Sequence, residues 1–372
     1  MNRTVKSQID ATGGRSSGFD YARIILSILV LCVHSNITSY GDIHDDMIWQ
    51  SPLKPFARLL LPMFFALSGF LVAGSLERSR TLVSFLGLRI IRIYPALAVE
   101  SLISAVVLGA ILTDLPIRKY YTDPQFFSYM YNIIGDPHYY LPGVFTRNPD
   151  PLIVNRQLWT VPYELLCYVV LAGLTLFGIR RRRIMAPIGA AVVIGLFVSA
   201  KLIAHHGMFP QFNTPLPGPM LVAAFLCGVA VHLYRDRLTY SVRWFAVTTL
   251  ASVALLGFVP FGEYIAPFPV SYVTVYLGLL NPKRLGVLKT ADYSYGVFLY
   301  GYAIQQAVCG SFVWARHWYV NIIVCLPLAM GVAALSWILV ERPALGLRVQ
   351  VQRLEHWVLR RFPAAQSRAP SP

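Results

Sequence analysis

Long apolar runs separated by short polar stretches dominate the chain. Windows of roughly 17 to 25 apolar residues, long enough to cross a bilayer as an α-helix, lie near residues 22–41, 56–75, 94–113, 158–178, 184–203, 218–234, 242–260, 264–281, 291–313 and 319–341. The eighth window is the weakest, because Pro267 and Pro269 interrupt its start. This pattern predicts an all-α polytopic membrane protein with about ten transmembrane helices.

The composition supports a membrane protein and excludes a water-soluble globule. Of the 372 residues, 56% are apolar and only 13% are charged, against roughly a quarter charged in soluble domains. All five cysteines lie inside apolar runs without paired spacing, so neither a disulfide framework nor a metal site is expected. The first twenty residues are polar, and we therefore expect no cleaved signal peptide.

The charge distribution predicts the orientation of the chain. With a cytoplasmic amino terminus, most of the 32 Lys and Arg residues fall on the cytoplasmic side, which predicts that both termini are cytoplasmic. The run from Arg180 to Arg183 is interpreted as a topology anchor, and no nucleic-acid partner is expected because no groove-reading motif accompanies the charge. The predicted organisation is a cytoplasmic arm over 1–20, a transmembrane domain over 21–342 and a cytoplasmic tail over 343–372.

One long connection, residues 114–157, is predicted on the outer face between the third and fourth spans. A loop of this length usually carries function. It combines aromatic, acidic and histidine residues: Tyr120, Tyr121, Asp123, Phe126, Phe127, Tyr129, Tyr131, Asp136, His138, Tyr139, Tyr140 and Asp150. This mixture suits stacking on sugar rings with hydrogen bonds to their hydroxyls. An aromatic belt at the membrane interface is the alternative interpretation.

Ionisable residues at bilayer depth are costly and usually mark a site. Of the eight histidines, only His34 lies well inside a predicted span, and Arg23 precedes it by eleven residues, or about three turns on the same helix face. Depth counting brings Glu164, Gln305 and Gln306 to a similar level. A carboxylate there can orient a histidine that acts as general base. A structural hydrogen bond between His34 and Glu164, joining two helices, is the alternative.

Three arginines are expected around the cytoplasmic end of the membrane domain. Arg89 and Arg92 share a helix face at i, i+3 spacing, and together with Arg23 they offer planar guanidinium groups suited to phosphates. Plain positive-inside anchoring is the alternative. Ser68, in the segment FFALSGF, is interpreted first as a packing position and second as a substrate contact, because no nucleophile elbow surrounds it.

Four separated segments resemble, in order, signatures of the acyltransferase-3 family, the polytopic membrane enzymes that O-acetylate bacterial glycans. The residues concerned are Arg23 and His34 in Arg-x10-His spacing, then Phe64, Phe65, Ser68, Gly69 and Phe70, then Arg89, Arg92, Tyr94 and Pro95, then Leu158, Trp159, Glu164 and Tyr168. SYGVFLY at 294–300 and ERP at 341–343 are similar to the family's closing pattern. Gly301 stands where many members carry a histidine, which weakens the case for a second catalytic histidine.

The resemblance implies transfer of an acyl group, usually acetyl, from cytoplasmic acyl-CoA to a sugar hydroxyl of a lipid-linked or extracytoplasmic glycan. The chain would then lie in the bacterial inner membrane, use acyl-CoA as a substrate without any bound cofactor, and act alone or with a separate extracytoplasmic partner. His34 would be the essential group, with Glu164 orienting it. The arginines would recognise the phosphates of the acyl donor, and Trp159, Ser68 and Tyr94 would contact substrate.

Two mechanisms and two other protein classes stay open on the sequence alone. His34 can remove the proton from the sugar hydroxyl as a general base, or it can carry the acyl group as an acyl-histidine intermediate. A transporter or flippase could use the same polar stripe, although the sequence shows no inverted repeat. A glycan polymerase would also explain the aromatic outer loop.

Overall fold

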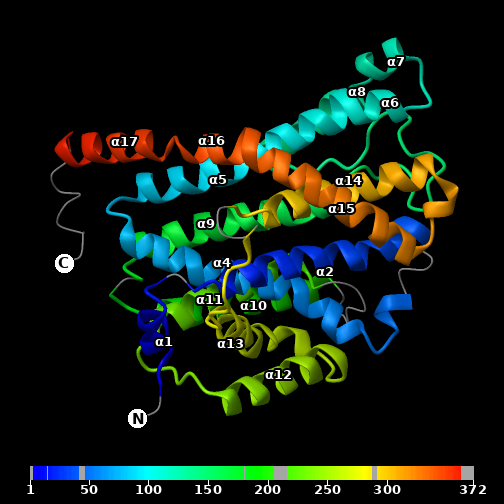
Figure 1. The fold of residues 1–372 in the computed structure, drawn as a ribbon. Coiled ribbons are helices and arrows are strands. Elements are labelled where there is room, and N and C mark those ends of the chain that lie inside the picture. Colours follow the sequence, from blue (N-terminus) through cyan, green and yellow to red (C-terminus); the bar gives the residue numbers. More distant parts are fainter. Residues whose placement is uncertain are drawn as a thin grey trace. The chain divides into compact units, whose positions relative to one another are not determined.

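The computed structural model describes residues 3–14, 16–41, 47–179, 181–204, 216–286 and 291–361. Among these residues the chain is helical and forms no strand beyond isolated bridges (Figure 1), which confirms the all-α class. Six helices are long and apolar enough to cross a membrane, namely Gly18–Tyr40, Lys54–Arg78, Leu82–Leu112, Arg156–Leu176, Met185–Ala204 and Trp318–Trp357. Helices also lie under the other four predicted windows, but they do not meet this criterion. Arg180 of the predicted anchor and residues 362–372 of the predicted tail lie outside the described residues.

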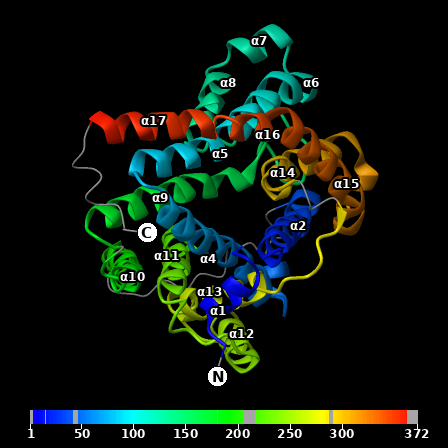
Figure 2. The ribbon, with the colours of Figure 1, turned by 60° about the vertical axis from the view of Figure 1, so that its left-hand side comes forward.

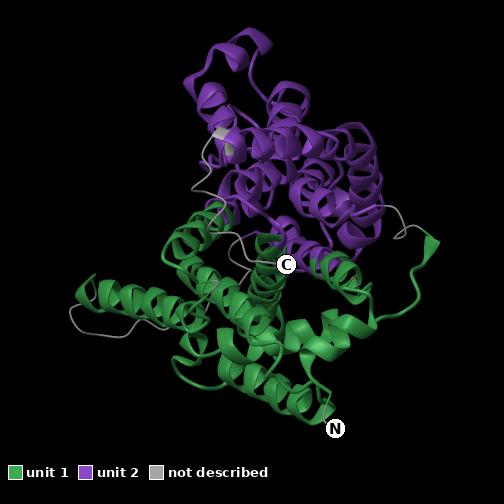
Figure 3. Ribbon diagram, turned by 90° about the vertical axis from the view of Figure 1, so that its left-hand side faces the viewer, with its two compact units in different colours: residues 1–26, 47–77, 163–290 green, residues 27–46, 78–162, 291–372 purple. Residues whose placement is uncertain are grey.

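Two compact units make up the chain (Figure 3). Unit 1 contains residues 1–26, 47–77 and 163–290, and unit 2 contains residues 27–46, 78–162 and 291–372. Helix α2 (Gly18–Tyr40) contributes residues to both units. Arg23 and Glu164 therefore belong to unit 1, whereas His34 belongs to unit 2.

Close packing of two helices characterises unit 1. Helices α4 (Lys54–Arg78) and α11 (Gly218–Leu233) run side by side (Figure 2). A Cβ at Gly69 would collide with the carbonyl oxygen of Phe225, and a Cβ at Gly228 would collide with that of Ala66. The two backbones touch at these glycines, so Gly69 of the FFALSGF segment serves close helix packing.

The other helices of unit 1 have the bounds that their apolar runs and caps dictate. They are α1 (Val5–Ala11), α9 (Val161–Leu176, whose first two residues belong to unit 2), α10 (Met185–Ala204), α12 (Val242–Gly257) and α13 (Pro267–Gly278). Thr4 caps α1 by accepting a hydrogen bond from the backbone of Ser7, so the predicted polar arm contains a helix. Helix α13 starts at Pro267, where the proline ring suits a first helical position.

Unit 2 is built on a long helix that starts earlier than the sequence predicted. Helix α5 (Leu82–Leu102) continues through the π-helix η1 (Ile103–Leu108) into α6 (Gly109–Leu112). Its start, twelve residues before the predicted span at 94, is fixed by Thr81, whose side chain accepts a hydrogen bond from the backbone of Ser84. Arg89 and Arg92 therefore lie well inside a helix.

Further helices surround α5 in unit 2. They are α14 (Ser294–Ser311), α15 (Trp318–Ser336), the π-helix η7 (Trp337–Glu341), α16 (Arg342–Leu345) and α17 (Arg348–Arg361). Helix α14 packs against α15, and α17 packs along α5 (Figure 2). The Glu355 carboxylate of α17 accepts hydrogen bonds from the backbones of Arg80 and Thr81, where it interacts favourably with the amino-terminal end of α5.

The long connection is a folded layer of unit 2 rather than an open loop. It contains α7 (Ile117–Thr122), α8 (Pro124–Tyr129) and the 3-10 helix η2 (Met130–Ile134). Tyr120 and Tyr129 are fully buried in its core, and the Tyr120 hydroxyl donates to the carbonyl of Ala105 at 2.6 Å. Burial raises the pKa of Tyr120 above its ordinary value. The expectation of sugar stacking is therefore wrong for these two tyrosines, while Phe127, Tyr131 and Tyr140 are exposed.

Alanine at either contact glycine should destabilise unit 1. Gly69→Ala and Gly228→Ala each place a methyl group against a backbone carbonyl of the neighbouring helix, and overpacking of this kind costs about 1–3 kcal/mol or more. We expect a lower thermal unfolding midpoint in detergent for both variants. Gly195→Ala in α10 is the matched control, because nothing lies within 4 Å of its added Cβ and Ala favours a helix by about 1 kcal/mol over Gly. Midpoints that are equal in all three variants would contradict the close approach.

Candidate functional site

His34 lies on the part of α2 that belongs to unit 2 and meets a tyrosine of α14. The imidazole and the Tyr302 ring pack edge to face, with centroids 5.2 Å apart at 84°. Arg156 and Gln157 lie close enough to interact with the imidazole. Its Nδ1 atom is buried and has no hydrogen-bond partner among the described residues. Buried polar atoms are normally hydrogen-bonded, so this nitrogen is suited to meet a substrate group.

A three-residue polar network holds Tyr302 beside His34. The Tyr302 hydroxyl donates to the Asp150 carboxylate and accepts a hydrogen bond from Arg156 Nε at 3.2 Å. Arg156 Nη2 in turn pairs with Asp150 Oδ1 at 2.6 Å. Asp150 is only 1% exposed, and a buried carboxylate needs a paired, hydrogen-bonded countercharge. The network thus ties the end of the long connection over 114–157 to the aromatic ring that faces His34.

Two buried glutamines of α14 fasten this arrangement. Gln306 Nε2 donates to the backbone carbonyl of Asp150 at 2.7 Å. Gln305 Nε2 donates to the carbonyl of Leu31 at 3.0 Å, about one helical turn before His34. Both glutamines are fully buried. They therefore fix the two chain segments that carry Asp150 and His34 against the same helix.

Arg92 is held by two carboxylates in unit 2. Its Nη2 lies 2.6 Å from Asp292 Oδ2, and its Nη1 lies 3.5 Å from Glu341 Oε2. The guanidinium also lies over the Tyr295 ring, 5.8 Å from the centroid. This pairing of Arg92 could not be predicted, because Asp292 and Glu341 are distant along the chain. Arg89 lies one turn earlier on the same helix, α5.

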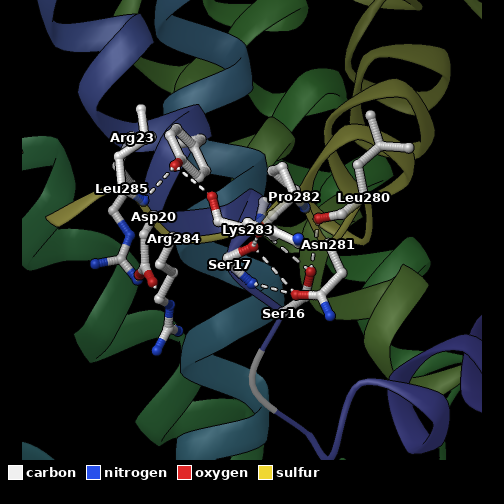
Figure 4. A network of polar contacts seen from close by, with 12 residues as sticks. Ser16, Ser17, Asp20, Arg23, Leu280, Asn281, Pro282, Lys283, Arg284 and Leu285 are labelled. Atoms are coloured by element: carbon white, nitrogen blue, oxygen red, sulfur yellow. Dashed lines mark hydrogen bonds and ion pairs between the residues drawn. The ribbon is translucent and has the colours of Figure 1, made fainter. Parts of the chain in front are cut away.

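Arg23 belongs to a polar network of unit 1 (Figure 4). Asp20 interacts with both Arg23 and Arg284, through Oδ1 at 3.9 Å and Oδ2 at 2.9 Å. Nearby, Ser17 binds the side chain of Asn281, which holds the 281–285 segment against the start of α2. Two guanidinium groups thus share one carboxylate, so a formal positive charge stays at this end of the helix. Arg284 was predicted only as one of several cytoplasmic charges.

The remaining predicted site residues are divided between the units. In unit 1, Glu164 on α9 accepts a hydrogen bond from the Tyr168 hydroxyl at 2.6 Å, and Ser68 on α4 is half-buried. In unit 2, Trp159 lies on the 3-10 helix η3 (Arg156–Thr160) and Tyr94 lies on α5, and both are half-buried. The pairing of Glu164 with His34 stays a prediction, because the two residues belong to different units.

Sequence reasoning missed the residues that surround His34 most closely. Neither Arg156 nor Tyr302 was singled out from the sequence as a site residue. A usable signal exists for Arg156, since it stands two residues before the Leu-Trp signature at 158–159. The described residues contain no group of three or more His, Cys, Asp or Glu side chains that could hold a metal ion.

Comparison with known proteins gives one family and two full-length relatives. A family model described as an acyltransferase domain matches residues 16–342. An O-acetyl transferase of Shigella phage Sf6 is 25% identical over 347 residues, which cover 88% of this chain and 96% of the relative. Nodulation protein 10 of Rhizobium leguminosarum bv. viciae is 27% identical over 364 residues, which cover 91% and 96%. No solved structure matches the chain.

Substitutions at Asp150 and Tyr302 should each lower the free energy of unfolding, and their effects should not add. Asp150→Asn leaves Arg156 without its charged partner, which we expect to cost about 1–3 kcal/mol, and Tyr302→Phe removes hydrogen bonds worth about 1 kcal/mol. In the double variant the loss of unfolding free energy should be smaller than the sum, because both changes affect the same carboxylate. Detergent unfolding curves measure this. Tyr300→Phe is the control, since its hydroxyl contacts Ser336 instead, and its effect should add to that of Asp150→Asn. Additivity in both pairs would refute the network.

Proposed function

This chain belongs to the acyltransferase-3 family, and from that premise we propose that it is a membrane O-acetyltransferase of glycans. That the protein is an acyltransferase follows from the family match over most of its length. The proposal adds acetyl-CoA on the cytoplasmic side as the acyl donor and a hydroxyl of a cell-surface or lipid-linked glycan as the acceptor. The names of the relatives, an O-acetyl transferase and a nodulation protein, support this proposal.

The observation that carries the proposal is the environment of His34. Its imidazole packs edge to face against the Tyr302 ring, and its buried Nδ1 atom has no hydrogen-bond partner among the described residues. In the proposed reaction, this imidazole accepts the proton of the sugar hydroxyl while the hydroxyl oxygen attacks the thioester carbonyl. The C–S bond then breaks and CoA leaves as the thiol after taking a proton. An acyl-histidine intermediate is the second route to the same products.

The other predicted residues have proposed roles in the same reaction. Glu164 orients or charge-balances His34, and Trp159 stacks on the acceptor sugar. Arg23 and Arg89 bind the phosphates of the acyl donor. Arg92 takes part less, because Asp292 and Glu341 already share its guanidinium. We place Ser68 and Tyr94 along the path of the acyl chain, as secondary contacts.

The proposed topology puts the chain in a bacterial inner membrane with ten crossings and both termini in the cytoplasm. Six of these crossings are supported by the six helices that are long and apolar enough to cross a membrane. Helices α11, α12, α13 and α14 would supply the other four, with flanking apolar residues extending the shorter ones toward the roughly 30 Å of hydrocarbon. The folded connection over 114–157 would then face outward, where it can meet the glycan or a separate extracytoplasmic partner.

Removal of the imidazole tests the proposed chemistry. His34→Ala should lower acetyl transfer from acetyl-CoA by at least about 100-fold, since a positioned acid–base group contributes about 10²–10⁴. The detergent unfolding midpoint should stay near that of the parent protein. His317→Ala is the matched control, because this histidine is exposed and stacks only on Tyr319. Activity within tenfold of the parent would make His34 structural and end the proposal in this form.

Two variants of the Asp20 network test acyl-donor binding, because they should change the KM for acetyl-CoA in opposite directions. Arg23→Ala should raise the apparent KM for acetyl-CoA several-fold, whereas Asp20→Asn should lower it, because the carboxylate competes with phosphate for the two guanidinium groups. Added salt should weaken both effects by screening. Arg23→Lys should rescue in part, since a point charge replaces a planar fork. Steady-state kinetics in detergent measure these constants, and a KM change of the same sign in both variants would indicate a structural role.

A further inference from the structure

A buried acidic residue of α5 takes no part in the scheme above. Glu100 lies about one helical turn before the first residue of the π-helix η1 and is fully buried. Its Oε1 atom accepts hydrogen bonds from Ser104 Oγ at 2.9 Å and from Asn155 Nδ2 at 2.7 Å. A carboxyl group at membrane depth is costly and is seldom retained for packing alone. The burial of this carboxyl group therefore indicates a functional role for Glu100.

Asn155 connects Glu100 to the surroundings of His34. It is fully buried, and its Nδ2 also donates to the carbonyl of Leu299 on α14 at 2.8 Å. The next residue is Arg156, which pairs with Asp150, and the one after it is Gln157, which donates to the carbonyl of Phe298. Fixing the Asn155 side chain thus fixes the direction in which the following two side chains leave the backbone.

The position of Asn155 shows that its side chain is used in an unusual way. It stands at the N-cap of η3, where an asparagine normally accepts a hydrogen bond from the first turn of its own helix. Here the backbone is extended, with φ −146° and ψ 92°, and the side chain makes no such bond. Its amide group instead binds Glu100 and α14. The Asn155 side chain thus makes tertiary hydrogen bonds instead of a helix-capping hydrogen bond.

The beginning of the outer connection is tied to the same helix. The hydroxyls of Tyr120 and Tyr121 donate to the carbonyls of Ala105 and Val106, at 2.6 and 2.8 Å, inside the π-helix η1. Such π segments often occur at functional sites, because they redirect backbone groups. The connection is therefore fastened to the Leu82–Leu112 helix at both ends, with Glu100 at the end that carries Arg156.

We propose that Glu100 is a positioning residue of the acyl-transfer site, which acts through Asn155 to hold Arg156 and Gln157 beside His34. The inference rests on the proposed function, in which His34 carries the chemistry. Glu100 neither touches the substrate nor exchanges a proton with it. Its contribution is to hold the geometry of the site, and a misplacement of about 1 Å can cost up to 100-fold in rate.

The kinetic test is a double-mutant cycle on the Glu100–Asn155 contact. Glu100→Ala and Asn155→Ala should each lower kcat for acetyl transfer by about tenfold or more, with the KM for acetyl-CoA within about twofold of the parent. The double variant should be no slower than the slower single variant, since both changes break one contact. Asn155→Ala carries the same expectation should Glu100→Ala not fold.

Two conservative variants separate positioning from other roles. Glu100→Gln keeps an oxygen acceptor for Asn155, and its amide replaces Oε2, which has no partner among the described residues. It should therefore retain kcat within about threefold, the range of one modest hydrogen-bond difference. Ser104→Ala removes the hydrogen bond from Ser104 Oγ to Glu100 Oε1 and should also keep kcat within about threefold of the parent. If Glu100→Gln were as slow as Glu100→Ala, the carboxyl would act by its charge or proton, and the proposal would be wrong.

A second measurement does not depend on activity. Backbone hydrogen exchange over 150–158 should speed up in Glu100→Ala and Asn155→Ala but not in Ser104→Ala or Glu100→Gln. Unchanged exchange in all four variants, or additive kinetic effects in the cycle, would overturn the proposal. If the parent protein transferred no acetyl group, the proposed function would fail on that ground, while the exchange data would still decide whether Glu100 anchors the segment.

Discussion

The ion pair between the buried Asp150 and the half-buried Arg156 is the interaction on which the surroundings of His34 depend. Asp150 is almost completely excluded from solvent, and an unpaired carboxylate there would cost several kcal/mol. Arg156 meets this requirement, and both side chains also bind the Tyr302 hydroxyl. The charge pair thereby fixes the ring that packs against His34. Neutralising one buried charge and orienting one aromatic ring are thus achieved by the same contacts.

The same logic extends to the uncharged polar residues of unit 2. Gln305, Gln306 and Asn155 are fully buried, and each donates to backbone carbonyls of neighbouring segments. In a low-dielectric interior such hydrogen bonds are strong and an unmade one is expensive, so the segments they join have little freedom to shift. The proposed acyl transfer would require a base, a hydroxyl and a thioester in near-attack geometry. A rigid polar framework around one histidine suits that requirement better than a packed apolar core, which would leave the imidazole without orientation.

The pattern of apolar runs was sufficient to predict where helices lie. It does not predict which polar side chains contact each other in the folded protein. The run after Thr81 is helical because the Thr81 cap and the apolar residues that follow act locally, yet the polar residues Arg89 and Arg92 within it concealed the early start. His34 was identifiable because one ionisable residue stood inside an apolar run. The pairing of Asp150 with Arg156 was not, since each resembles an ordinary loop charge until folding buries Asp150 and brings Arg156 against it. The same holds for Tyr120 and Tyr129, whose residue type suits a sugar platform and a core equally.

The number of carboxylates around each arginine also distinguishes Arg92 from Arg23, which have equivalent predicted roles in the sequence analysis. Arg92 in unit 2 faces two carboxylates, Asp292 and Glu341, which leaves a formal surplus of negative charge around it. Asp20 in unit 1 faces two guanidinium groups, which leaves a formal surplus of positive charge. In the proposed function, an incoming phosphate would have to displace carboxylates at Arg92, whereas at Asp20 it would join two guanidinium groups that share one carboxylate. The proposed anionic acyl donor is therefore assigned to the start of α2, while Arg92 ties α5 to the segments that carry Asp292 and Glu341.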